Sequence, residues 1–434
     1  MPRLPAWLDR YRLLPKMVFL FAAGQFLINL INSAQFLLLN LFLKSLGMQD
    51  PGIAALSSQR FVAVFVLSIP AGLWLRGRRL RVPLVVASAL FPAFALAGLE
   101  AARGGHIQAA SGCFLAMGFA GLVLNVTGLP MMLRIAPKEH TSEALSLLFA
   151  TWAGSAICGG ALATGLQWLG HIDWAGISIA LDEHATLMLL TLAGFGAPFL
   201  YARLPDTASA RHGDQHWLHI HREDRPLLLR ALVPTLCIAT GAGLSIQFMN
   251  LFFSNVHDLA PATYSAYGTL SNVLVLFAGL LVPEVRRRFG WRGAILGVQA
   301  IAVVLLAVMG LTELWQAAAW AMPLAVGLFI LRQPLMSMAG PATSELTMCY
   351  VGPRNHELIS ACNGAIWSGS WWLAAKIFEH LRAAGIPYWQ VFLATAVLYG
   401  CGTLAYLGLI RASETPGDPG PTHPPPTDER SRVA

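Results

Sequence analysis

The sequence predicts an all-α integral membrane protein with twelve transmembrane helices, arranged as two pseudo-symmetric bundles of six. Three observations support this fold class: a composition too apolar for a soluble domain, twelve apolar runs of membrane-crossing length, and an internal repeat. Of the 434 residues, 56% are hydrophobic and 12% are charged. Soluble domains carry about 25% charged residues, so the chain is predicted to reside in a bilayer.

The apolar runs divide evenly between the two halves of the chain. Each has about 18 residues or more, which a helix needs to cross a hydrocarbon core of about 30 Å. The first six span 17–43, 53–75, 83–101, 109–133, 144–168 and 184–203, and the second six span 227–256, 262–283, 293–312, 317–343, 358–381 and 388–410. Residues 1–203 and 227–411 are therefore expected to be the two six-helix bundles.

Short motifs recur in the second half at a nearly constant spacing. The tripeptide Asn-Leu-Phe stands at 40–42 and 210 positions later at 250–252, and a proline follows each copy, at 51 and 261. Trp152 and Trp367 each begin a similar Trp-x-Gly-Ser motif. An arginine cluster also recurs: Arg76, Arg78, Arg79 and Arg81 in the first half, and Arg286, Arg287, Arg288 and Arg292 in the second. Two repeated halves of apolar helices are typical of secondary transporters.

The charges of the loops predict how the helices are oriented. Loops rich in arginine and lysine, at 76–81, 134–138, 203–230, 286–292 and 354, alternate with poorly charged ones near 44–52, 102–106, 169–183, 257–261 and 382–387. Because positive loops stay on the cytoplasmic side, both termini are predicted to be cytoplasmic. The net charge of +7 is explained by this bias and indicates no nucleic-acid partner. We expect a multi-pass protein of the cytoplasmic (inner) membrane.

Two polar segments lie outside the predicted bundles. Residues 204–226 form a predicted cytoplasmic linker that contains His212, His216, His219 and His221. These histidines either gather as metal ligands or lie on an amphipathic segment at the membrane surface, which is favoured because no cysteine or carboxylate completes a ligand set. Residues 412–434, rich in proline, are predicted to be a disordered cytoplasmic tail. The six cysteines are scattered singly, and no motif indicates a cofactor or a metal.

The basic loop after the second helix of each half resembles the signature loop of the major facilitator superfamily. The family pattern is roughly Gly-x-Leu-Ala-Asp-Arg-x-Gly-Arg-Arg, and the two copies here are residues 72–81 and 283–292. Neither copy has the acidic residue at its usual place. Pro130 in the fourth helix and its counterpart Pro341 extend the resemblance, which covers residues 15–411. It implies two six-helix bundles and alternating access to a small-molecule substrate, with or without a coupling ion. We expect a monomer.

By the same resemblance, charged side chains of these loops are expected to form an inner gate. The expected gating residues are Arg76, Arg78 and Arg79 in the first half and Glu284, Arg286 and Arg288 in the second. Glu284 can replace the missing acidic residue of the family pattern.

Two arginines in the apolar runs break the repeat. Arg60 lies in the second run, where its counterpart is Leu270, and Arg332 lies near the middle of the tenth run, opposite Gly121. A membrane-embedded arginine costs about 2.5–3.5 kcal/mol on insertion scales, so each should face the interior and have a partner or a use. Few carboxylates are available as partners, which predicts an anion-binding cavity. The alternative is hydrogen bonding to backbone carbonyls at a helix break, for instance near Pro334.

Amide and aromatic side chains complete the predicted substrate site. The amide candidates lie on the first, seventh and eleventh helices: Gln25, Asn29, Asn32, Gln247, Asn250 and Asn363. Those on the first helix are spaced by four and three residues and so share one face. Trp152 and Trp367 are expected to flank the cavity and stack on a ring or an acyl chain, with helix packing as the alternative.

The sequence therefore predicts a secondary transporter of a small organic solute, anionic or amphipathic, that works by alternating access. A lipid or lysolipid flippase and a non-transporting membrane sensor are the alternatives. An enzyme is not expected, because no set of catalytic residues shares one membrane depth. Asp50, Asp258 and Glu345 are the candidate carboxylates for proton coupling, and uniport or anion exchange stays open.

Overall fold

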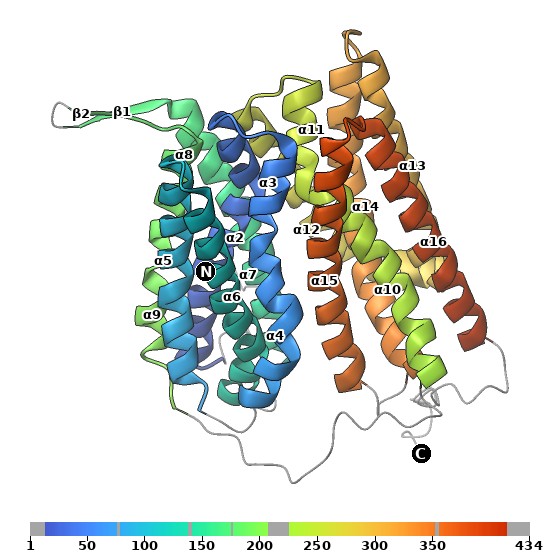
Figure 1. The fold of residues 1–434 in the computed structure, drawn as a ribbon. Coiled ribbons are helices and arrows are strands. Elements are labelled where there is room, and N and C mark those ends of the chain that lie inside the picture. The colour runs from blue at the N-terminus through green and yellow to red at the C-terminus, as the bar shows by residue number, and fades with distance from the viewer. Residues whose placement is uncertain are drawn as a thin grey trace, which may run out of the picture.

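The computed structural model describes residues 14–75, 79–137, 141–174, 177–206, 225–351 and 356–414. Within these residues, the helices group into twelve membrane-crossing segments that stand as two bundles side by side (Figure 1). The predicted all-α membrane fold is confirmed. Most predicted spans end within a few residues of the helices that the structure contains.

The first bundle is built from residues 16–201. Its crossing segments are α2 (Lys16–Ser45), α3 (Asp50–Ser57) continued by α4 (Gln59–Leu75), α5 (Arg81–Arg103), α6 (Ile107–Ile135), α7 (Thr141–Leu169), and α8 (Glu183–Ala193) continued by α9 (Gly196–Tyr201).

The second bundle is built from residues 225–414. Its crossing segments are α10 (Arg225–Ser245) continued through the 3₁₀ turn η2 (Ile246–Phe248) by α11 (Met249–Val256), α12 (Pro261–Trp291), the π-helical η3 (Arg292–Gly297) continued by α13 (Val298–Leu311), α14 (Ala321–Val351), α15 (His356–Ala383) and α16 (Tyr388–Glu414). A short 3₁₀ turn, η4 (Thr312–Trp315), follows α13.

The prolines of the sequence repeat stand at equivalent places in the two bundles. Pro51 lies in the first turn of α3 and Pro261 in the first turn of α12. Proline loses no helical hydrogen bond there, because the first amides of a helix have no partner within it. The repeated motif therefore marks where the second crossing segment of each bundle begins.

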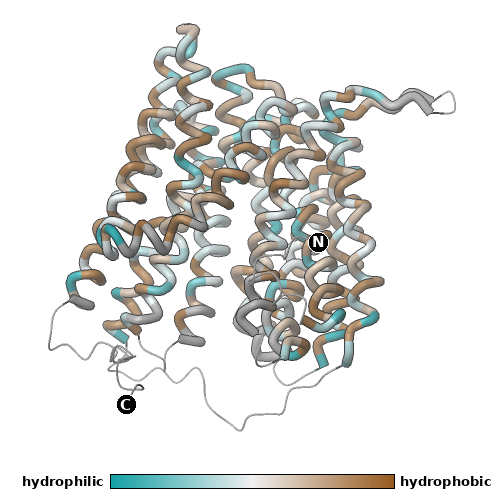
Figure 2. Tube along the Cα trace, turned by 180° about the vertical axis from the view of Figure 1, so that it is seen from behind, coloured by the Kyte–Doolittle hydropathy of each residue, from teal (hydrophilic) through white to brown (hydrophobic). Residues whose placement is uncertain are grey.

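Exposed apolar side chains form stripes at helical spacing on the outer surface. On α5, Val82, Val86 and Leu90 are 62%, 51% and 42% exposed. Figure 2 shows hydrophobic residues along the length of the helices in both bundles. Large exposed apolar surfaces of this kind mark contact with a membrane or a partner, and on helices of this length they are explained by surrounding lipid.

Among the described residues, nine helical stretches are long and apolar enough to cross a membrane by length and composition alone. The other three crossing segments are α7, α12 and α15. Each of them borders the other bundle, since α7 packs against α12 and α15 packs against α4.

A β-hairpin follows α7, in a segment that the sequence analysis treats as a loop. Strand β1 (His171–Trp174) pairs antiparallel with β2 (Ile177–Ala180), with His171 opposite Ala180. In Figure 1 the hairpin projects sideways from the top of the first bundle. We call this end of the molecule the hairpin face, and the opposite end, where α9 ends and α10 begins, the linker face.

Candidate functional site

A large cavity lies between the two bundles. Its volume is about 780 Å³, within the range of about 300–1,000 Å³ typical of small-molecule sites. Side chains from both bundles line it, among them Arg60 on α4, Trp152 on α7, Arg332 on α14 and Trp367 on α15.

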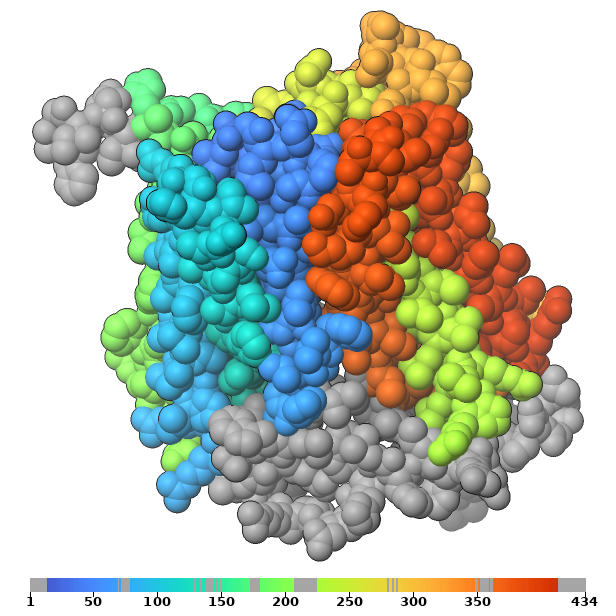
Figure 3. Space-filling model, in the orientation of Figure 1, coloured from blue at the N-terminus to red at the C-terminus, as the bar shows by residue number. Residues whose placement is uncertain are grey.

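Aromatic side chains close the seam between α4 and α15 on one side of the cavity. Phe61 meets Trp371 edge-on at 5.4 Å between ring centroids, and Phe65 stacks on Trp372 at 6.3 Å. A Cβ atom on Gly369 would lie only 2.4 Å from the ring of Phe65, so the absence of a side chain lets the two helices meet. Figure 3 shows α4 against α15 along this seam.

Two asparagines close the cavity toward the hairpin face. The Nδ2 group of Asn40 on α2 donates to Asn250 Oδ1 on α11 at 3.1 Å and to the backbone carbonyl of Gln247 at 2.7 Å. Asn250 Nδ2 donates in return to the Leu37 carbonyl at 3.1 Å. The 3₁₀ turn η2 breaks the helix at this height, and Asn40 pairs with a carbonyl of that break. Asn40 of the first bundle thus satisfies a backbone carbonyl of the second bundle that the break leaves without its helical partner.

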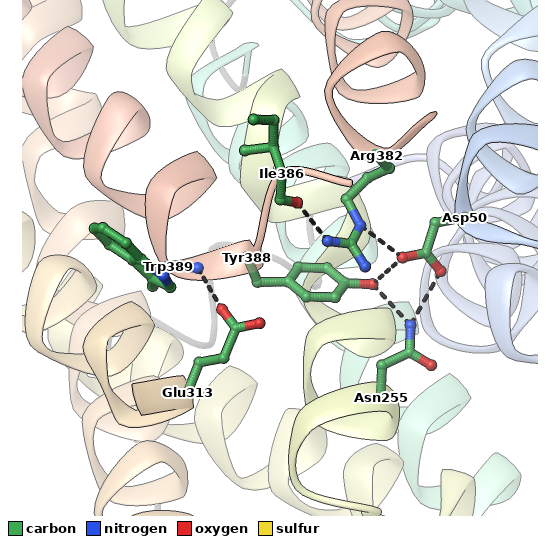
Figure 4. A network of polar contacts seen from close by, with 7 residues as sticks. All are labelled: Asp50, Asn255, Glu313, Arg382, Ile386, Tyr388 and Trp389. Carbon is green, nitrogen blue, oxygen red and sulfur yellow. Dashed lines mark hydrogen bonds and ion pairs between the residues drawn. The ribbon is translucent and has the colours of Figure 1, made fainter. Parts of the chain in front are cut away.

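A charged network joins the bundles closer to the hairpin face. Asp50, at the start of α3, accepts hydrogen bonds from Arg382 Nε at 2.9 Å, from the Tyr388 hydroxyl at 2.5 Å and from Asn255 Nδ2 at 3.0 Å. Figure 4 shows these groups converging on the carboxylate, with the three donors all from the second bundle. The Asp50 and Arg382 side chains are only 11% and 20% exposed, so the ion pair is weakly screened by water.

Toward the linker face the cavity continues along the described helices. Its lining extends along α14 to Thr347, one helical turn before α14 ends at Val351. On the other side it stops at Leu37 and Met249, below the Asn40–Asn250 contact. Among the described residues, the polar contacts that join the bundles thus lie toward the hairpin face, and the cavity extends toward the linker face.

Arg332 is buried in the cavity wall. It is 3% exposed, and the phenol group of Tyr399 lies beside its guanidinium. The ring of Tyr264 also lines the cavity near it. Its Nε atom is buried and has no hydrogen-bond partner. A buried donor without a partner is costly unless a ligand or a water completes it.

Arg60 lies on the first bundle's side of the cavity. Its Nη1 group donates to Gln35 Oε1 at 3.3 Å, while its Nε atom is buried without a partner. Gln35 is 1% exposed and donates through Nε2 to the Met117 sulfur at 3.5 Å. Gly118 on α6 lets the backbone of α4 approach closely at Arg60, because a Cβ on this glycine would lie 2.3 Å from the Arg60 carbonyl oxygen.

Among its described lining residues, the cavity carries two positive charges and no negative one. Among the lining residues that the structure describes, Arg60 and Arg332 are the charged side chains, and none is Asp or Glu. The partners described for the two guanidinium groups are neutral, an amide and a phenol. An arginine guanidinium stays protonated under all physiological conditions, so this cavity attracts anions.

Tryptophans and an amide add aromatic and polar surface to the cavity. Trp152 and Trp367 both line the cavity and are 62% and 41% exposed. Trp371 lies 6.4 Å from Trp367 between ring centroids. The Trp371 Nε1 donor and the Asn363 Oδ1 acceptor are buried without partners. These residues therefore offer aromatic faces, a donor and an acceptor that have no other described partner.

The predicted site residues separate into two groups. The cavity brings together Arg60, Arg332, Asn32, Asn363, Trp152 and Trp367. The other four lie away from the lining: Gln25, Asn29, Gln247 and Asn250. Gln25 accepts from the Tyr201 hydroxyl at 3.3 Å inside the first bundle. Gln247 and Asn250 belong to the contact that closes the hairpin face.

Most of the predicted gating residues cannot be placed. Arg76 and Arg78 lie outside the described residues, as do the side chains of Glu284 and Arg286. Arg288 is exposed, and Arg79 pairs with Asp206 of its own bundle at 3.4 Å. The histidines at 212–221 and the tail from 415 onward also lie outside the described residues. Within the described part of the chain, no group of three or more His, Cys, Asp or Glu could hold a metal.

Several residues in or beside the cavity wall were not predicted as part of the site. Among them, Gln35 accepts a hydrogen bond from Arg60, Tyr399 lies beside Arg332, and Trp371 joins the aromatic wall. Gln35 follows Asn32 by three residues and so continues the same helix face, a signal that the sequence contains. Tyr399 and Trp371 sit among many other aromatic residues, and only the packing identifies them.

Comparison with known proteins shows the family and the fold. Residues 21–375 match the Major Facilitator Superfamily, while the comparison with curated proteins yields no match. A crystal structure of a bacterial homologue of the iron transporter ferroportin in the inward-facing state aligns with a TM-score of 0.71 at 11% identity, covering 91% of this chain and 98% of that one. The structure in the outward-facing state scores 0.59 at 12% identity, covering 91% and 99%.

The nucleoside transporter NupG aligns with a TM-score of 0.65 at 15% identity, covering 92% of this chain and 100% of that chain. At these identities the likeness shows the fold alone.

Proposed function

We propose that the substrate of this multi-pass secondary transporter is a small organic anion with an apolar or aromatic body. The chain belongs to the major facilitator superfamily, which sets the transport class. Transport proceeds by alternating access, in which the closed hairpin face opens as the linker face closes. An enzymatic role does not fit the family.

The observation that carries this proposal is the charge of the cavity. Arg332 and the Nε atom of half-buried Arg60 are buried there. The described groups beside the two guanidinium groups are neutral, and the described lining contains no carboxylate. Charge-assisted hydrogen bonds to guanidinium are the strong ones, and the planar fork of arginine matches a carboxylate or a phosphate. A bound anion would accept hydrogen bonds from the two Nε groups that have no other partner.

The rest of the ligand is proposed from the remaining lining. A ring or short acyl chain would lie between Trp152 and Trp367, where stacking adds to apolar burial. A hydroxyl or amino group would donate to Asn363 Oδ1, which has no other partner. We assign Asn32 to the same substrate site, and Gln247 and Asn250 to the gate that closes the hairpin face. Gln25 and Asn29 are placed in helix packing.

The filled seam between α4 and α15 supports a solute carrier over a lipid flippase. Phe61 and Phe65 pack there on Trp371 and Trp372. A flippase needs a lateral opening at this seam for an acyl chain, and the rings occupy that space.

The orientation follows from the positive loops. We propose that the linker face is cytoplasmic, that the protein lies in the inner membrane with both termini inside, and that the structure is inward-open. A reporter that works only in the cytoplasm should be active when it is fused after Ala210. A reporter at this position that is active only on the outer side would contradict the proposed orientation.

Ligand binding by Arg332 variants tests the substrate class. Thermal shifts of the purified protein would be measured with 4-hydroxybenzoate, indole-3-acetate and decanoate, and with the matching neutral amides, because a ligand that binds only the folded state raises apparent stability. At least one acid should stabilise the protein and its amide should not. Arg332→Gln should weaken binding by roughly 10- to 100-fold, and Arg332→Lys less, because lysine keeps the charge without the fork.

Arg103→Gln is the matched control, since it removes an exposed arginine at the end of α5. It should leave the shifts unchanged. If no acid binds, or if Arg332→Gln binds as the wild type does, the arginine is structural and the substrate is not an anion.

A further inference from the structure

The two cavity arginines come from opposite bundles. Arg60 lies on α4 of the first bundle and Arg332 lies on α14 of the second. Each has a neutral described partner, Gln35 or Tyr399, and each keeps a buried Nε atom without a partner. The anion site proposed above is therefore divided between the two bodies that must move past each other.

Described carboxylates of both bundles are engaged elsewhere. Asp50 is held by Arg382 and Tyr388 near the hairpin face, and Glu379 pairs with Lys376. Others pair at the ends of helices: Glu100 with His184, Asp206 with Arg79, and Glu313 with the Trp389 amide. None of these acids lines the cavity, so none neutralises the arginines when the cavity is empty.

Closing the empty cavity would place both charges in a dry space. A sphere of the cavity's volume is about 11 Å across, similar to the Debye length of about 8–10 Å in physiological salt. While the cavity is open, water and dissolved ions screen the two guanidinium groups. An occluded state removes that screening, and removing an uncompensated charge from water is costly. An anion that enters with its charge removes the cost.

We propose that this transporter is an obligatory anion exchanger. The loaded carrier passes through the occluded state and the empty carrier does not, so one anion must enter the cavity before the bundles can return. One anion moves inward for each that moves outward, and anions of equal charge leave the net charge on each side unchanged. A proton cannot replace the returning anion, because protonation only adds positive charge to the cavity. The proposal rests on the proposed function, since it assigns the same site an anionic ligand.

The first test needs no substrate. Spin labels would be attached at Val82→Cys and Leu229→Cys, exposed positions near the linker-face ends of α5 and α10, in a protein whose six native cysteines are replaced. Distances would be measured in proteoliposomes without organic anions. In the double variant Arg60→Gln/Arg332→Gln, the ratio of linker-closed to linker-open protein should rise on the order of tenfold.

The double variant Arg60→Lys/Arg332→Lys is the matched control, because it keeps both charges. It should remain open like the wild type. Size-exclusion profiles and melting temperatures show that each variant is folded, as expected when an unpaired charge leaves the membrane. Equal distance distributions in the wild type and the double glutamine variant would overturn the proposal, whatever the substrate is.

The second test measures transport of 4-hydroxybenzoate. Proteoliposomes loaded with the labelled acid would be diluted into buffer with or without unlabelled acid, with equal K⁺ on both sides and valinomycin to prevent a membrane potential. External acid should accelerate efflux at least about tenfold. Efflux that is equally fast without external acid would show that the empty carrier returns, and would overturn exchange while leaving the anionic substrate intact. Failure of any acid to bind or move would instead refute the proposed function.

Discussion

Replacing Asp50 by asparagine should shift the transporter toward a state with an open hairpin face. The Asp50 carboxylate bridges the bundles, with Arg382, Tyr388 and Asn255 as its donors. Asn keeps one carbonyl oxygen as an acceptor, and it loses the charge and the second acceptor. Because these contacts cross between the bundles, their loss acts on the equilibrium between the two states more than on the folding of either bundle.

The expected size follows from the geometry of the network. A hydrogen bond to a charged group contributes about 1.5–3 kcal/mol, and the two side chains are 11% and 20% exposed. Allowing for that partial screening, the substitution should destabilise the closed hairpin face by about 2–3 kcal/mol. This corresponds to roughly a 30- to 150-fold change in the ratio of the two states.

Spin-label distances across the hairpin face measure this ratio. Suitable exposed positions are Ile107→Cys at the start of α6 and Leu314→Cys in η4. Asp50→Asn should increase the population with a long distance. Glu379→Gln is the control, because Glu379 pairs at 2.7 Å with Lys376 of its own helix. The reasoning fails if Asp50→Asn leaves the distances unchanged, or if Glu379→Gln changes them equally.

Two further predictions concern packing and gating. Gly118→Ala places a Cβ atom 2.3 Å from the Arg60 carbonyl oxygen, so it should cost about 1–3 kcal/mol by overpacking and weaken anion binding in the thermal-shift assay. The control is Gly128→Ala on the same helix, whose added Cβ would meet nothing within 4 Å; it should leave stability and anion binding unchanged. A harmless Gly118→Ala would contradict the tight contact. Asn40→Ala and Asn250→Ala should each favour the open hairpin face by about 1–2 kcal/mol. Since they share a bond of 3.1 Å, the double variant should shift less than the sum, and additive effects would count against that bond.

The sequence predicts the helices well because lipid sets their length and composition. Runs of about 20 apolar residues have few alternatives to a membrane helix. The hairpin at 171–180 was missed, because a short strand pair needs only local backbone pairing and leaves a weak pattern in the sequence.

The cavity could be predicted only in part. Arg60 and Arg332 were identified because a charge in a membrane requires an explanation, and the cavity contains both. Gln25 and Asn29 share a helix face with Asn32 and still lie away from the cavity. Periodicity identifies residues on one face, but the depth of each turn and the neighbour it meets depend on how the bundles pack.

The Asn40–Asn250 contact bears on the ancestry of the chain. The two residues are 210 positions apart, the spacing of the sequence repeat, so each is predicted to be the other's counterpart. Lys44 and Ser254, which hydrogen-bond at 2.8 Å, have the same separation. In a symmetric dimer, a residue on the two-fold axis contacts its own copy.

A single asparagine codon in a half-length ancestor would thus have supplied both sides of the Asn40–Asn250 contact before the gene was duplicated and fused. The Asp50–Arg382 pair has a different history. Asp50 shifted by 210 leads to Ala260, and Arg382 shifted by the 215 positions that separate Trp152 from Trp367 leads to Gln167. These two residues cannot form an ion pair, so this half of the gate would reflect divergence after fusion, when the two halves could mutate independently.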